Sequence, residues 1–250
     1  MKQESKKLEN FISTIFLFLP AALISGPFLS DLIISIMSIY IIFIITKHRL
    51  IDIFRNKFVI LFLSFYIYII LLSLSSKNIF LSLESSLFYF RFLFFSLCIA
   101  YLINNDHNLK VKIKYSFFIT LTILVFDAYL QFFSGKNILG FNYSYSRVSS
   151  FFNDELILGS YLARMMPILL GLVATTSLTK KSEVYYAFCL LIAIDVLTFL
   201  SGERTAFSLI TFATIILILT IKNFSMIRLT SFIISSILIF IIMFTFDDVK

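Results

Sequence analysis

Apolar runs of membrane-crossing length recur along the whole of this 250-residue chain. A helix rises about 1.5 Å per residue, so about 20 apolar residues cross the hydrocarbon core of a bilayer. Inside that core every backbone N–H and C=O group needs a partner within the protein, and a helix supplies one locally. The sequence therefore predicts an all-α, polytopic transmembrane helix bundle. We expect about nine spans, over residues 11–27, 30–46, 58–75, 86–103, 115–133, 157–176, 184–200, 205–221 and 229–246.

The composition also indicates a membrane protein. The chain is 60% hydrophobic and 14% charged, whereas about a quarter of the residues in soluble domains are charged. A net charge of +7 would indicate a nucleic-acid partner in a soluble protein, but here the basic residues lie in short loops and set the topology. We therefore expect no nucleic acid as partner. Glycine and proline are scarce, with 6 and 3 residues, so we expect a single transmembrane domain over residues 1–250.

The basic residues are divided unequally between the two ends of the expected spans. Cytoplasmic loops of membrane proteins carry an excess of lysine and arginine, so this asymmetry predicts a cytoplasmic N-terminus. It also puts Arg147, Arg204 and the loop over residues 134–156 on the outer face. Fourteen of the 21 basic residues fall in the expected cytoplasmic segments: Lys2, Lys6, Lys7, Lys47, Arg49, Arg55, Lys57, Lys110, Lys112, Lys114, Lys180, Lys181, Lys222 and Arg228.

A short polar stretch, residues 201–207, interrupts two long apolar runs over 184–200 and 207–221. The break is too short to form a domain, so we expect a tight turn at the membrane surface. Arg204 falls where the second helix would begin, and a cation at a helix N-terminus opposes the helix macrodipole. Arginine beside free N–H groups is, however, a good receptor for anions. We interpret Arg204 as an anion-binding residue.

Four ionisable residues fall inside expected spans: Arg91, Asp127, Arg164 and Asp195. Such residues are costly in a membrane and usually face a polar interior. Each lies about one to two turns from the outer end of its helix, which predicts one polar cavity that opens to the outer face. In a second interpretation, Arg164 pairs with Asp127 or Asp195 and only holds helices together. For Arg91, the acid nearest in sequence is Glu84, almost two turns away.

The loop after the fifth span is the longest expected on the outer face. Its aromatic residues Phe141, Tyr143 and Tyr145 suit stacking on sugar rings, but they also suit an interfacial aromatic belt.

The end of this loop is acidic. Asn153 is a good N-cap for the sixth span, with Asp154 and Glu155 in its first turn. General acid or base chemistry is the alternative role for these two acids. Arg147, in the same loop, has no comparable structural explanation.

Several motifs are missing from the sequence. It has no P-loop or Rossmann glycine pattern and no zinc-ligand spacing, so we expect no cofactor and no metal. The two histidines, His48 and His107, fall in expected cytoplasmic loops, and the two cysteines, Cys98 and Cys189, fall inside apolar runs. Chemistry on the outer face would then depend on arginines, carboxylates, tyrosines or the substrate's own leaving group.

Three stretches share the expected outer placement: Phe126–Gly135 (FDAYLQFFSG) followed by Gly140, Arg147–Leu162 (RVSSFFNDELILGSYL) leading to Pro167, and Leu200–Phe207 (LSGERTAF). In this order they resemble the bacterial O-antigen ligase/polymerase family. The stretch Phe90–Phe95 resembles that family more weakly.

The resemblance implies a multi-pass glycosyltransferase of the bacterial inner membrane that works at the periplasmic face. Members act on oligosaccharides linked to undecaprenyl pyrophosphate. The polymerase joins the growing chain to the next lipid-linked repeat, and the ligase transfers it to lipid A-core. Neither needs a nucleotide sugar or a metal, because the lipid pyrophosphate is the leaving group. Membrane lipid and other polysaccharide-assembly proteins are the further partners that it implies.

The resemblance also implies roles for individual residues. Arginines on the outer face would neutralise the pyrophosphate as its charge grows. The candidate catalytic residues are Arg204, Arg147, Glu203, Glu155 and Asp154, with the acids as candidate bases for the acceptor hydroxyl. The candidate substrate-binding residues are Arg91, Arg164, Asp127, Gln131, Tyr143 and Tyr145.

The chain departs from the family at its C-terminus. Members continue into a large periplasmic loop and further spans, and in ligases that loop carries a histidine implicated in catalysis. This sequence ends at Lys250, where that loop would begin, so we expect a C-terminal truncation.

Three functions remain beside a polymerase. The resemblance, through the pairs Asp154–Glu155 and Glu203–Arg204, favours a polymerase over a ligase. A transporter or flippase of lipid-linked sugars would use the same arginines without chemistry, but the chain has no clear internal repeat and little glycine or proline within its spans. A degenerate remnant without activity is the third alternative.

Overall fold

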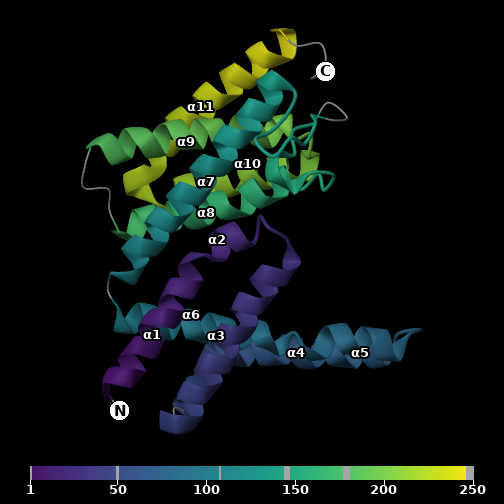
Figure 1. Cartoon of the computed structure of the whole chain (residues 1–250), viewed down its shortest axis with the longest axis vertical. Coiled ribbons are helices and arrows are strands. Elements are labelled where there is room, and N and C mark those ends of the chain that lie inside the picture. The colour runs from purple at the N-terminus through teal and green to yellow at the C-terminus, as the bar shows by residue number, and fades with distance from the viewer. Residues whose placement is uncertain (1, 49–50, 107, 144–146, 177–180, 246–250) are drawn as a thin grey trace. The chain divides into compact units, whose positions relative to one another are not determined.

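The structure is a computed structural model that describes residues 2–48, 51–106, 108–143, 147–176 and 181–245 (Figure 1). Within these ranges the regular structure is helical, and Lys136 and Asn142 form an isolated antiparallel bridge. The all-α prediction is confirmed. The elements are α1 (Lys2–Leu17), α2 (Leu19–Ala22), α3 (Pro27–His48), η1 (Ile51–Arg55), α4 (Lys57–Leu74), α5 (Ile79–Leu87), α6 (Phe90–Asn105), α7 (Leu109–Ser134), η2 (Ser150–Phe152), α8 (Leu158–Thr176), α9 (Lys181–Leu200), α10 (Arg204–Thr220) and α11 (Lys222–Thr245).

Seven helical stretches in the described ranges are long and apolar enough to cross a membrane. They are α3, α4, the combined stretch Ile79–Asn105 that holds α5 and α6, α7, α8, α9 and most of α11. Their length and composition indicate a multi-pass membrane protein. The other two expected spans are also helical, but α1 is polar in its first half and α10 is a shorter apolar helix of 17 residues. The count of nine spans and the orientation stay predictions.

The chain divides into two compact units, Met1–Leu109 and Lys110–Lys250. The division falls at the start of α7. Each unit has contacts of its own and is described by itself.

In the first unit, α3 and α6 pack along each other. Ser38 Oγ of α3 donates to the carbonyl oxygen of Arg91 in α6 at 2.7 Å. Further along both helices, the rings of Tyr40 and Tyr101 meet edge to face with centroids 6.5 Å apart. The helix α1 contacts α3, and its Phe16 packs against Phe95 of α6.

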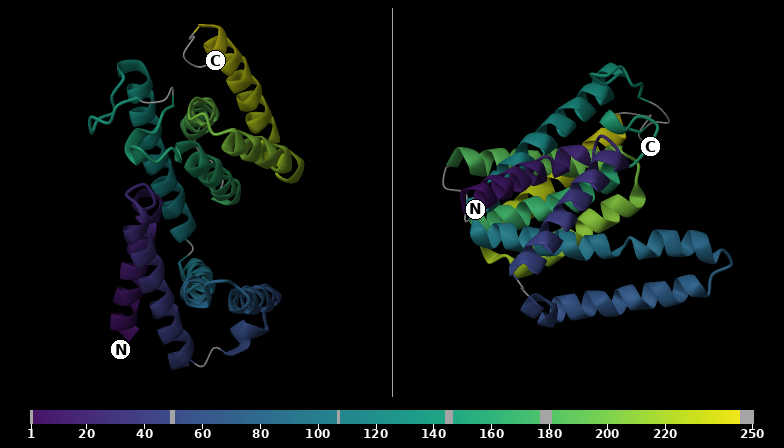
Figure 2. Two further views of the ribbon diagram at one scale, coloured as in Figure 1. Left: turned by 90° about the vertical axis from the view of Figure 1, so that its right-hand side faces the viewer. Right: turned by 60° about the horizontal axis from the view of Figure 1, so that its bottom comes forward.

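The helix α4 lies beside α5 and α6 (Figure 2). Asn56 caps its start by accepting from Phe58 N at 3.0 Å, and Tyr66 Oη donates to the Leu87 carbonyl oxygen at 2.9 Å. Most apolar side chains of α4 are not covered by the chain, as expected for a helix that contacts lipid.

In the second unit, α8 packs against α9 and α10, and α11 packs against the same two helices. Leu162, Ile194 and Ile210 are fully buried among them. The helix α7 runs parallel to α9, because residues later in α7 contact residues later in α9. Tyr115 Oη donates to Glu183, Thr122 forms a hydrogen bond with Tyr186, and Tyr129 Oη donates to the Ala193 carbonyl oxygen.

Candidate functional site

The turn between α9 and α10 covers residues 201–203, as the sequence predicted. Gly202 N donates to the Phe199 carbonyl oxygen at 3.0 Å. The φ of Gly202 is +69°, a left-handed conformation that glycine adopts without a steric penalty. The chain therefore reverses quickly, and α10 begins at Arg204.

Glu203, in this turn, closes the N-terminus of α8. Its Oε1 accepts from Gly159 N at 2.7 Å and its Oε2 accepts from Ser160 N at 3.1 Å, while Ser160 Oγ also donates to Oε2. The first N–H groups of a helix have no acceptor within the helix, and a negative charge there is favoured by the macrodipole. Glu203 thus fastens α8 to the α9–α10 turn.

This arrangement corrects the prediction for the start of the sixth span. The helix begins at Leu158, so Asn153 is not its N-cap and the two following acids are not in its first turn. Asn153 instead has a φ of +52° and donates to Asp154 Oδ2 at 3.3 Å. The prediction was wrong because the capping carboxylate lies 44 positions later in the chain, where no local pattern reveals it.

The side chain of Arg147 lies against Gly202. A Cβ atom placed on Gly202 would be 2.7 Å from Arg147 Nε. The neighbouring Val148 N donates to the Leu200 carbonyl oxygen at 3.3 Å, so the backbone after Arg147 is tied to the end of α9. The structure thus brings Arg147 to the turn that carries Arg204.

Neither arginine is paired with an acid among the described residues. Arg147 is half-buried and Arg204 is exposed at the first position of α10. The carboxylate next to Arg204 in sequence, that of Glu203, is engaged by α8. Two uncompensated guanidinium groups at one turn form a candidate site for an anion.

The loop that carries Arg147 is fastened to α7 by Gln131. Its Oε1 accepts from Ser149 N at 3.0 Å and from Ser150 N at 2.7 Å. Its Nε2 lies 3.3 Å from the Asn142 carbonyl oxygen, to which it donates. Gln131 is fully buried, so its amide holds the loop and does not face a cavity.

Asp127, one turn before Gln131, holds the same loop. It accepts from Ile138 N at 2.9 Å, from Asn137 Nδ2 at 3.3 Å and from Ser150 Oγ at 2.5 Å. Asn137 Nδ2 also donates to the Ser150 carbonyl oxygen at 3.0 Å. Ser150 has a φ of +52°, and every polar group it carries is bonded. Such a conformation persists in a non-glycine residue only when its surroundings fix it.

The remaining loop residues differ in their surroundings. The ring of Tyr143 packs edge to face against Phe132, with centroids 6.1 Å apart. Asp154 and Glu155 are exposed just before α8. Tyr145 lies outside the described residues.

Asp195 forms a buried ion pair with Arg228 of α11. The distances are 2.7 Å from Arg228 Nη1 to Asp195 Oδ2 and 2.9 Å from Nη2 to Oδ1. Arg228 Nε also donates to Thr214 Oγ1 of α10 at 3.0 Å, and Ser235 Oγ donates to Asp195 Oδ2 at 3.1 Å. Arg228 therefore lies inside the helix packing, with 1% of its surface exposed, and not in the loop where the sequence placed it.

Arg164 pairs with neither acid, so the second interpretation, an ion pair with Asp127 or Asp195, is wrong. Its side chain is exposed on α8. Asp127 and Asp195 are fully buried with separate partners. These three charges therefore do not share one polar cavity.

Arg91 belongs to the first unit. Its Nη2 donates to Asp31 Oδ2 at 3.0 Å and to Oδ1 at 3.1 Å, so its partner is Asp31 and not Glu84. Asp31 lies 60 positions away in α3, so Arg91 is paired with an acid that its neighbouring sequence does not reveal.

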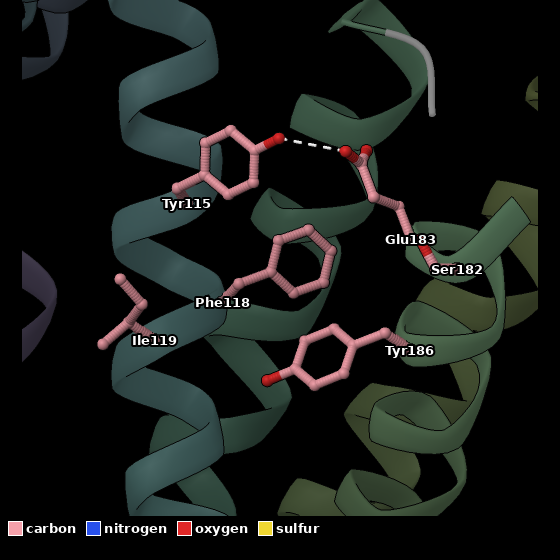
Figure 3. A pocket seen from close by; sticks show the side chains of 6 residues that line it. All are labelled: Tyr115, Phe118, Ile119, Ser182, Glu183 and Tyr186. Carbon is pink, nitrogen blue, oxygen red and sulfur yellow. Dashed lines mark hydrogen bonds between the residues drawn. The ribbon is translucent and has the colours of Figure 1, made fainter. Parts of the chain in front are cut away.

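A pocket of about 440 Å³ lies between α7 and α9, near the start of both helices (Figure 3). Tyr115 Oη donates to Glu183 Oε1 at 3.0 Å across it. Lys114, predicted in a loop, lies in α7 with its Nζ 3.5 Å from Glu183 Oε2. The pocket is lined by Tyr115, Phe118, Ile119, Ser182, Glu183 and Tyr186.

The sequence interpretation missed several residues that shape the candidate site. Asn137, Ser150 and Gly159 all make contacts there. A Cβ atom on Gly159 would overlap Ser201 Oγ and lie 3.0 Å from Glu203 Oε1. A glycine early in a helix, such as Gly159, is a signal of close approach, whereas Asn137 and Ser150 carry no such local signal.

Replacing Glu203 by alanine is expected to lower the free energy of unfolding by about 1–2 kcal/mol, because the first N–H groups of α8 lose their cap. Titration with SDS in mixed micelles would measure the change. Asp154→Ala is the matched control, since its exposed carboxylate makes no contact with α8 in the described structure. Equal stabilities of the two variants would contradict the capping role.

The described residues contain no group of three or more His, Cys, Asp or Glu side chains arranged to hold a metal ion. The site offers positive charge from two arginines, and the exposed acids Asp154 and Glu155 follow Arg147 in the same loop. Comparison of the chain with family models, with curated proteins and with solved structures gives no match.

Proposed function

We propose that this chain is a polymerase-like glycosyltransferase. It joins sugar repeats carried on undecaprenyl pyrophosphate, and it does so at the periplasmic face of a bacterial inner membrane. Its reaction centre is the end of the second unit where α9 ends and α10 begins.

One observation carries this proposal: Arg147 and Arg204 come from distant segments to the same turn, and neither is neutralised by an acid among the described residues. A lipid pyrophosphate gains negative charge as it leaves the sugar. Fixed guanidinium groups stabilise such developing charge and can bind two phosphate oxygens at once. The pair of arginines is therefore suited to the leaving group of this reaction.

The acceptor hydroxyl needs a base, and the three candidate acids are not equivalent. Glu203 has both oxygens occupied by donors from Gly159 and Ser160. Asp154 and Glu155 are exposed and close in sequence to the arginine loop. We assign the base to one of these two, and the role of Glu203 to holding the turn.

The experiment that tests the proposal is deletion of the gene in the bacterium that carries it, followed by electrophoresis of the surface polysaccharide. A polymerase predicts a ladder that collapses to a single repeat. Loss of all attached chains, with lipid-linked polymer accumulating, would identify a ligase instead. An unchanged ladder would contradict both.

Complementation with Arg147→Ala or Arg204→Ala is expected to reduce polymer formation about 100-fold or more, the usual effect of removing one group that stabilises a developing oxyanion. The rate is measured as polymer formed by membranes supplied with lipid-linked repeats. Lys136→Ala is the matched control, because it removes an exposed positive charge from the same loop. If both arginine variants formed polymer as fast as Lys136→Ala, the anion site would be contradicted.

A further inference from the structure

The side chain of Arg147 passes directly over Gly202. A Cβ atom at position 202 would lie 2.7 Å from Nε, 3.0 Å from Cγ and 3.1 Å from Cδ of Arg147. These three are consecutive atoms of one side chain, so the arginine spans the glycine along much of its length. Any side chain at position 202 would occupy the space that Arg147 now fills.

The backbone is held on both sides of this contact. On the arginine side, Val148 N is bonded to the Leu200 carbonyl oxygen, and the next two N–H groups are bonded to Gln131 Oε1. On the glycine side, Gly202 N is bonded to the Phe199 carbonyl oxygen, and the next residue is fastened to α8. Because neither backbone is free to move away, a new side chain at position 202 would displace the side chain of Arg147.

We infer that Gly202 is a positioning residue: the absence of a side chain there fixes the guanidinium of Arg147 at the turn that carries Arg204. The consequence for anion binding rests on the function proposed above. The geometric part, that a methyl group at position 202 moves Arg147, does not depend on it.

The chain offers a matched control for backbone strain. Gly140 also has a left-handed backbone, with a φ of +86°, but a Cβ atom there would meet nothing within 4 Å. Both Gly202→Ala and Gly140→Ala force alanine into a conformation that favours glycine. The Gly202 substitution alone places a methyl group against an arginine side chain.

The first measurement is the rate at which phenylglyoxal modifies Arg147 in the purified chain in detergent, resolved by mass spectrometry of peptides. Displacement of the guanidinium is expected to raise this rate in Gly202→Ala relative to wild type, while Gly140→Ala leaves it unchanged. Equal rates in the two glycine variants would overturn the inference.

The second measurement is the affinity for inorganic pyrophosphate, by isothermal titration calorimetry. Loss of one charge-assisted contact weakens binding about tenfold, so Arg147→Ala and Gly202→Ala are expected to show similar losses. The double variant Arg147→Ala/Gly202→Ala is expected to bind no more weakly than Arg147→Ala. Additive losses in the double variant would mean that Gly202 acts otherwise than through Arg147, and would overturn the inference.

Failure of the proposed function has a different signature. If wild type does not bind pyrophosphate, or Arg147→Ala binds as well as wild type, the anion site is refuted while the modification rates still decide the position of Arg147. If Gly202→Ala does not fold, the double variant is expected to fold, because its alanine at position 147 removes the clash. A double variant that also fails to fold, beside a folded Gly140→Ala, would overturn the inference.

Discussion

Replacing Arg228 by alanine is expected to lower the free energy of unfolding by about 3–5 kcal/mol, the usual result of removing one partner of a buried ion pair. Asp195 would keep its bond from Ser235 but lose both contacts with the guanidinium. Both residues are buried among α9, α10 and α11, so solvent cannot replace the lost charge. SDS titration in mixed micelles measures the change.

Two further variants separate charge burial from other effects. Arg164→Ala removes an exposed arginine from α8 and is expected to change stability little. The double variant Asp195→Leu/Arg228→Met replaces the pair by apolar side chains, and such replacements are often neutral or stabilising. A double variant as unstable as Arg228→Ala would show that packing around the pair, and not the uncompensated charge, causes the loss.

The second large effect is expected at Asp127. Asp127→Ala removes the acceptor of Ile138 N, Asn137 Nδ2 and Ser150 Oγ. A buried donor left without an acceptor costs about 1–3 kcal/mol, so we expect a loss of about 3 kcal/mol in the free energy of unfolding. The left-handed conformation of Ser150 would also lose one of its supports.

The effect should be concentrated in the loop. Amide hydrogen exchange is expected to rise between residues 135 and 153 in Asp127→Ala, while α9 and α11 keep their protection. Phe126→Ala, at an exposed position one residue earlier on α7, is the control. Unchanged exchange in the loop would contradict the role of Asp127 as its anchor.

These two networks perform different tasks in the second unit. The ion pair of Asp195 and Arg228 joins α9, α10 and α11. Asp127 and Gln131 fix the loop that leads to Arg147. Charged and polar residues within the spans therefore stabilise the structure that supports the candidate site, whereas Arg147 and Arg204 at the turn have no acidic partner among the described residues.

The sequence by itself determined the helices and the turn. Long apolar runs become helices because the backbone satisfies its own hydrogen bonds locally in a medium without water, and this property depends on nearby residues alone. The turn at 201–203 was predictable for the same reason: a glycine between polar residues interrupts two such runs. The sequence also shows that neither Arg147 nor Arg204 has a local structural explanation, and their anion-binding role stays a prediction.

The tertiary structure decided which side chains meet. Glu203 reaches α8, Arg228 reaches Asp195, and Arg91 reaches Asp31, across separations of 44, 33 and 60 positions. A helix sequence shows which residues share a face, but not which face of another helix will lie against it. For that reason the neighbouring sequence did not reveal the partner of Arg91, the interpretation that paired Arg164 with an acid was wrong, and so was the cap expected for α8. The physical cause is that pairing of buried charges depends on packing between distant segments, which local sequence does not encode.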